Sequence, residues 1–149
     1  MKREADGRPE HKVRFRVPFH DLDPLQMVWH GNYHKYFDIV REGLFRELGA
    51  ELYDFHLRTG YLFPVIRSSV KYIRPLFFHD EFVCRARLAE WKRKLIVDFD
   101  IRLLKDNTLC ALGQSEQAAM KSPEMELLLL IPEELRDLLG GGSAKSERP

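Results

Sequence analysis

The sequence predicts an α+β domain in which one five-stranded antiparallel sheet wraps around one long helix. Three observations indicate this class. One long amphipathic segment lies near the N-terminus, the segments around it alternate apolar and polar residues, and the connections between them are short. A lone helix covers only part of such a sheet. The free apolar face and the sheet edges therefore also predict association with a second copy.

The first strand and the helix follow from two different periods. Apolar residues alternate with polar ones over 12–19, which is typical of a strand with one buried face. A turn is expected over 21–27, and from Asn32 the apolar residues recur at helical spacing. Gly49 is placed to end this helix, and Gly60 to end a shorter one over 51–59. The predicted buried face of the long helix consists of Tyr33, Tyr36, Phe37, Val40, Leu44 and Leu48.

The remaining chain is mainly strands, expected over 63–74, 82–91, 95–103 and 108–120. Lys92, Arg93 and Lys94 form the turn between the middle two. Gly113, inside the last strand, indicates a bulge or the close approach of another backbone. A short helix is expected over 132–139. We therefore predict a flexible leader over 1–11, one domain over 12–139 and a disordered tail over 140–149.

Composition narrows the class of protein. A chain of 149 residues with 24 basic and 23 acidic side chains is one globular domain without the charge excess that drives nucleic-acid binding. The polar N-terminus is unlike a signal peptide, and the longest apolar run, 127–131, is too short to span a bilayer. Cys84 and Cys110 lie in apolar segments without metal-type spacing, which favours buried reduced thiols. We expect a cytoplasmic protein without membrane insertion.

The segment 21–33 carries the chemistry. Asp23 stands in a tight turn before Pro24, and His30 lies just before the start of the long helix. One carboxylate, one imidazole and a row of backbone N–H groups are thereby brought into a small volume. The carboxylate or its water can attack an activated acyl group, while the helix start holds the developing oxyanion. Asp21 is a rival carboxylate, interpreted as a solvated turn residue.

The same residues resemble a known family. The order of strand, motif, helix and antiparallel strands is similar to hotdog-fold acyl-CoA thioesterases of the 4-hydroxybenzoyl-CoA thioesterase family, including relatives associated with the Tol–Pal system. The likeness covers about residues 12–121. Its most specific part is the pattern Asp23, Pro24, Val28, His30, Asn32 and Tyr33.

The resemblance implies a set of roles. Asp23 is the nucleophile or the general base, and the backbone N–H of His30 polarises the thioester carbonyl. The neighbouring Gly31 contacts the substrate. The turn of Lys92, Arg93 and Lys94 would contact the phosphates of coenzyme A. The family places its sites between the two chains of a dimer, so a homodimer or homotetramer is expected. No metal and no cofactor are implied, since coenzyme A is part of the substrate.

Two positions depart from the family pattern, which usually has Gly where this chain has Gln26, and Tyr in many relatives where it has Phe19. Gly permits backbone angles that Gln finds costly, so either the turn changes shape or the Gln26 side chain helps to hold substrate or water. Lys71 and Arg74 are weaker phosphate candidates. A non-hydrolytic hotdog protein that binds acyl-CoA or acyl-carrier protein is the alternative, and a hydratase or dehydratase ranks below it.

Overall fold

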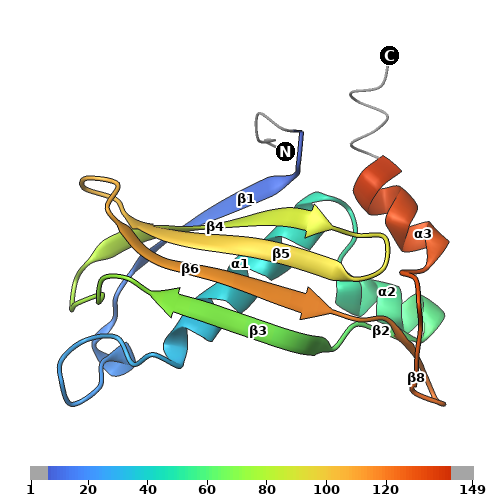
Figure 1. Cartoon of the computed structure of the whole chain (residues 1–149), viewed down its shortest axis with the longest axis horizontal. Helices are drawn as coiled ribbons and strands as arrows, with labels where there is room; N and C mark the ends of the chain where they lie inside the picture. The colour runs from blue at the N-terminus through green and yellow to red at the C-terminus, as the bar shows by residue number, and fades with distance from the viewer. Residues whose placement is uncertain (1–6, 142–149) are drawn as a thin grey trace.

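The protein, seen in a computed structural model that describes residues 7–141, is built on one five-stranded antiparallel sheet in the order β1-β4-β5-β6-β3. The long helix α1 crosses one face of this sheet, as Figure 1 shows. The strands of the main sheet are β1 (Glu10–Arg16), β3 (Val65–Tyr72), β4 (Glu81–Glu90), β5 (Leu95–Leu103) and β6 (Leu109–Gln117). The predicted α+β architecture is thereby confirmed.

Smaller elements gather at both ends of the sheet. A short turn, η1 (Phe19–Asp21), precedes α1 (Asn32–Glu47), and α2 (Leu52–Thr59) follows it. A second sheet joins β2 (Tyr61–Leu62), β7 (Met120–Lys121) and β8 (Glu126–Leu127). The chain then forms α3 (Glu133–Arg136) and a π-helical turn, η2 (Asp137–Gly141). No helix within residues 7–141 is long and apolar enough to cross a membrane.

Helix α1 has the limits that the sequence indicates. It begins at Asn32, and the chain leaves it through Gly49, whose φ of 73° is the left-handed conformation typical of a residue just beyond a helix. The predicted apolar face is buried from Tyr33 to Leu44. The Phe37 ring stacks on Phe99 of β5, with ring centroids 4.3 Å apart. This stack sets how closely α1 approaches the sheet.

Gly113 explains that close approach. The strand register is regular at Gly113, which pairs with both Val70 and Phe99. A Cβ atom at this position would come within 2.4 Å of the Phe37 ring. Of the two predicted alternatives, the bulge is not found at Gly113. The Ser69 backbone oxygen does come close, at 3.2 Å from such a Cβ atom, but the Phe37 ring is nearer and is the main reason for the glycine.

Three boundaries differ from the prediction. Strand β1 already begins at Glu10, which pairs with Arg87, so two residues of the predicted leader belong to the sheet. Phe19 is 74% exposed, because β1 ends before Pro18 and the chain turns away through η1. Gly140 lies in the η2 turn. The other parts of the predicted leader and tail, 1–6 and 142–149, lie outside the described residues.

Edge strand β3 is unusually open. Seven of its eight residues are exposed, and only Val70 is half-buried. Among the described residues β3 pairs with β6 alone, so its other edge presents unpaired backbone groups. Its apolar residues Val65, Ile66 and Tyr72 are each close to half exposed.

Candidate active site

The loop between β1 and α1 is anchored by Asp21. Its carboxylate accepts hydrogen bonds from the Lys35 ammonium and the Tyr36 hydroxyl, both at 2.5 Å. Its backbone oxygen accepts two more, from the Asn32 side chain at 2.9 Å and the Trp29 N–H at 3.0 Å. The side chain is 2% exposed. The interpretation of Asp21 as a solvated turn residue is therefore wrong: it ties the loop to the first turn of α1.

The Asp21 anchor predicts a pH dependence of stability. Burial raises the pKa of this carboxyl, but the hydrogen bonds from Lys35 and Tyr36 outweigh burial and hold the pKa below its usual range. A carboxyl with a lowered pKa contributes its full stability above about pH 4, the unfolded value, and loses it as the pH falls through the folded value. We expect urea denaturation to give a falling free energy of unfolding below about pH 4, and a smaller fall in Asp21→Asn. Equal slopes in both proteins would contradict this.

Asp23 is held in a tight turn by its own loop. Its Oδ1 accepts the N–H of Leu25 at 2.9 Å. Its backbone N–H donates to the Met27 carbonyl, and its backbone carbonyl accepts the Gln26 N–H, each at 2.8 Å. No hydrogen bond to Oδ2 is found within residues 7–141. One oxygen therefore orients the half-buried carboxylate and the other stays available.

Gln26 occupies the position where glycine is usual in the family. Its φ is 66°, in the left-handed region that glycine enters freely. Of the two alternatives left open by the sequence, a changed turn shape is thus not needed to accommodate Gln26. The exposed residue does not line the cavity described below, and its contact with substrate stays a prediction.

This strain predicts a stabilising substitution. In Gln26→Gly the left-handed cost of about 1–2 kcal/mol disappears, partly offset by the greater freedom of glycine in the unfolded chain. We expect the free energy of unfolding to rise by about 0.5–1 kcal/mol in urea denaturation. Lys105→Gly, in an exposed turn without a positive φ, serves as the control and should not stabilise. A lower stability of Gln26→Gly would show that the left-handed turn is not the source of strain.

His30 contributes a backbone donor at the entrance to α1. The carbonyl of the preceding residue, Trp29, accepts the Asn32 N–H at 2.9 Å. The N–H groups of His30 and Gly31 have no acceptor within residues 7–141, and no side chain caps the helix. These groups lie at the positive end of a 16-residue helix and can bind an oxyanion.

One cavity joins Asp23 to His30. This Asp23 cavity has a volume of about 400 Å³, and apolar side chains dominate its wall. The two residues predicted to carry the chemistry thus face the same space, from the turn and from the helix entrance. The other lining residues are Leu25, Met27, Val28, Tyr33, Tyr72, Ile73, Arg74 and Pro75.

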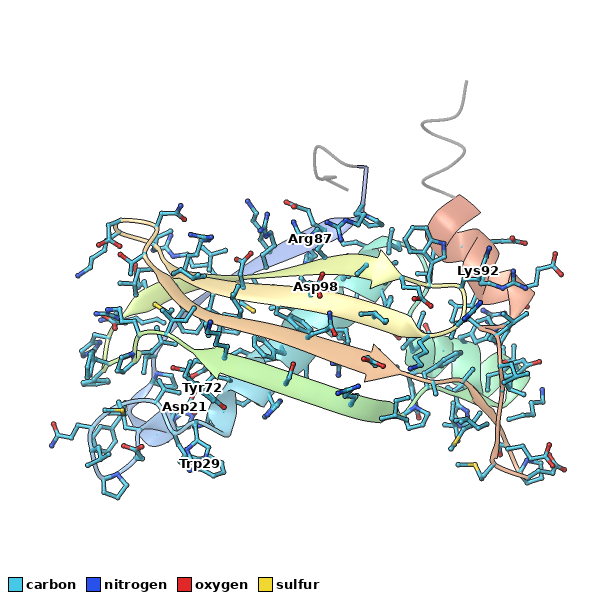
Figure 2. All side chains as sticks on the ribbon, viewed as in Figure 1. Asp21, Trp29, Tyr72, Arg87, Lys92 and Asp98 are labelled. Carbon is cyan, nitrogen blue, oxygen red and sulfur yellow. The ribbon has the colours of Figure 1, made fainter. Side chains whose placement is uncertain are left out.

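The basic turn lies elsewhere. Lys92, Arg93 and Lys94 are exposed between β4 and β5. Figure 2 shows Lys92 near the opposite end of the sheet from Tyr72 and Trp29. Lys94 is paired with Glu116 at 3.0 Å. A single chain therefore does not bring the predicted phosphate contacts to the Asp23 cavity.

Three further predicted positions differ in their relation to the Asp23 cavity. Arg74 lines the cavity, where its guanidinium donates to Asp80 at 3.3 Å, whereas Lys71 does not line it. Gly31 lies beneath the Trp29 ring, which a Cβ atom at residue 31 would meet at 2.2 Å. Within residues 7–141, no group of three or more His, Cys, Asp or Glu side chains could hold a metal ion.

A five-stranded antiparallel sheet wrapped on one long helix is the architecture of the hotdog fold, the fold of the thioesterase class. The profile of the thioesterase-like superfamily matches residues 17–139, and the chain belongs to that family. The family resemblance read from the sequence is thus confirmed.

Individual proteins agree with this placement. A protein of Aquifex aeolicus (strain VF5) that carries the provisional name of esterase is 26% identical over 126 residues, which are 85% of this chain and 94% of that protein. The 1,4-dihydroxy-2-naphthoyl-CoA thioesterase of Synechocystis has a similar structure, with a TM-score of 0.79 at 14% identity, over 88% of this chain and 96% of that one. A 4-hydroxybenzoyl-CoA thioesterase variant in complex with 4-hydroxybenzoyl-CoA has a TM-score of 0.77 at 15% identity, over 88% of this chain and 99% of that one. At these identities the two structures establish the fold.

Proposed function

We propose that this protein hydrolyses an acyl-CoA thioester to the free acid and coenzyme A, with Asp23 and the His30 N–H at the reacting carbonyl. The observation that carries the proposal is the shared cavity, which has the available Asp23 oxygen and the unpaired entrance of α1 on its two sides. The apolar wall is suited to an acyl group, and the family supports thioester chemistry.

The chemistry follows from these groups. Asp23 removes a proton from a water whose oxygen attacks the acyl carbon; alternatively, its own oxygen attacks and water then hydrolyses the acyl-aspartate. In both routes the carbon–sulfur bond breaks, and the sulfur leaves as a thiolate that takes up a proton. A thiolate is a good leaving group, so no strong general acid is required. One oxyanion donor such as the His30 N–H contributes about 3–4 kcal/mol to the transition state.

We further propose that the working form contains at least two copies joined along β3. Val65 of β3 and Leu95 of β5 both pair with Gln117, so the basic turn lies at the Val65 end of the sheet. Antiparallel pairing of two β3 edges sets this end beside the Tyr72 end of the other copy. The basic turn of one copy then lies at the same end of the joined sheet as the Asp23 cavity of the other copy. Three strand spacings, about 15 Å, separate β5 of one copy from β3 of the other. Sedimentation of the 17.6-kDa chain as a monomer would contradict this assembly.

Release of free thiol tests the hydrolysis. The protein is incubated with acetyl-, hexanoyl-, palmitoyl-, benzoyl- and 4-hydroxybenzoyl-CoA, and a thiol-reactive dye follows free coenzyme A. We expect steady turnover of at least one thioester. Saturable binding without thiol release would instead favour the alternative of a non-hydrolytic acyl-CoA binder, and the same assay with acylated carrier protein extends that comparison.

A further inference from the structure

Tyr72, at the end of β3, reaches across the Asp23 cavity to the residue that carries the proposed oxyanion donor. Its hydroxyl donates to the backbone oxygen of His30 at 2.8 Å, and the two residues are 42 positions apart in the sequence. The rings of Tyr72 and His30 also meet edge to face, with centroids 6.3 Å apart. Burial raises the pKa of Tyr72, so the hydroxyl keeps its proton at neutral pH.

The bond completes a set that holds the backbone on both sides of the His30 N–H. On the preceding side, the Trp29 N–H is bound by Asp21 and the Trp29 carbonyl by the Asn32 N–H. On the following side, the His30 carbonyl is bound by Tyr72. Because a peptide group is planar, the Trp29 carbonyl fixes the direction of the His30 N–H, and the His30 carbonyl fixes the direction of the Gly31 N–H. Tyr72 is the one clamp in this set that comes from outside the loop and its helix.

We infer that Tyr72 is a positioning residue: its bond to the His30 carbonyl fixes the His30–Gly31 peptide, so that the Gly31 N–H, beside the His30 N–H, is aimed at the thioester oxygen in the transition state. The inference rests on the proposed function, since it needs a carbonyl in the Asp23 cavity. An oxyanion donor is effective when it is aimed beforehand, and small misplacements of reacting groups reduce rates strongly. The hydroxyl should therefore act on kcat more than on KM.

The substitution Tyr72→Phe removes the hydroxyl and keeps the ring, which packs on Tyr33 with centroids 4.9 Å apart. We expect kcat to fall about tenfold while KM stays within about twofold, which is the signature of an interaction made in the transition state. The matched control is Tyr53→Phe, an exposed tyrosine of α2 whose hydroxyl has no hydrogen bond within residues 7–141. Its kinetics should equal those of the unchanged protein.

A spectroscopic measurement separates positioning from a general loss of structure. The thioester carbonyl stretch of bound 4-hydroxybenzoyl-CoA is recorded by Raman difference spectroscopy in Asp23→Asn and in Asp23→Asn with Tyr72→Phe. We expect the second substitution to move the band toward its frequency in free solution, because the carbonyl loses an aimed donor. If this thioester is not a substrate, the fastest one of the panel replaces it.

The possible outcomes are distinct. An unchanged kcat in Tyr72→Phe, a rise in KM alone, or an unmoved carbonyl band would each overturn the role of Tyr72 while leaving thioester hydrolysis in place. A protein that releases no thiol from any acyl-CoA would overturn the proposed function and, with it, this inference.

Discussion

Replacing Asp23 by Asn is expected to lower kcat for acyl-CoA hydrolysis by about 10³-fold, with little change in stability. The amide cannot act as a base or a nucleophile. It can still accept the Leu25 N–H through its oxygen, as Oδ1 of Asp23 does at 2.9 Å, so the turn should keep its shape. Initial rates of thiol release and a thermal melt of the same sample measure the two effects.

Asp106→Asn is the matched control for this experiment. Asp106 also closes an exposed turn by accepting the N–H two residues ahead, from Thr108 at 3.0 Å, but it does not line the Asp23 cavity. We expect its turnover to equal that of the unchanged protein. Hydrolysis by Asp23→Asn at a near-normal rate would remove the carboxylate from the mechanism.

A second large effect is expected from Gly113→Val. The added side chain would begin with a Cβ atom 2.4 Å from the Phe37 ring, which is itself fixed on Phe99. Overpacking of this kind costs about 1–3 kcal/mol or more, because α1 or the ring must move. Urea denaturation should give a correspondingly lower free energy of unfolding.

A double substitution identifies the cause. Phe37→Leu shortens the side chain above Gly113, so the loss caused by Gly113→Val should be smaller in that background than in the unchanged protein. Simple additivity of the two losses would mean that the Phe37 ring is not what excludes a side chain at position 113.

Periodicity was sufficient for most of the fold. The helical spacing from Tyr33 to Leu44 and the alternation in β4 and β5 depend on which face meets the core, and a sequence displays this directly. Boundaries were less accurate: β1 begins earlier because of its pairing with β4, and that pairing is a long-range property. A glycine inside a strand pattern indicates that position 113 is crowded, but local sequence does not identify the Phe37 ring that lies above it.

The site was only partly predictable for the same reason. Asp23 and His30 are seven residues apart, and a turn followed by a helix brings them to one cavity. The sequence does not reveal the anchoring role of Asp21, because its partners Lys35 and Tyr36 lie on a helix whose polar positions look solvated in sequence. Tyr72 gave no local signal, since it meets His30 only when β3 is placed against the entrance of α1.

The strand that supplies Tyr72 to the cavity wall is also the open edge of the sheet. Any chain that adds hydrogen bonds along that edge would stiffen the wall from outside. Quaternary association and ligand binding would then be thermodynamically linked: dilution that separates the subunits would loosen the reaction chamber, and a ligand that tightens the chamber would strengthen association in return.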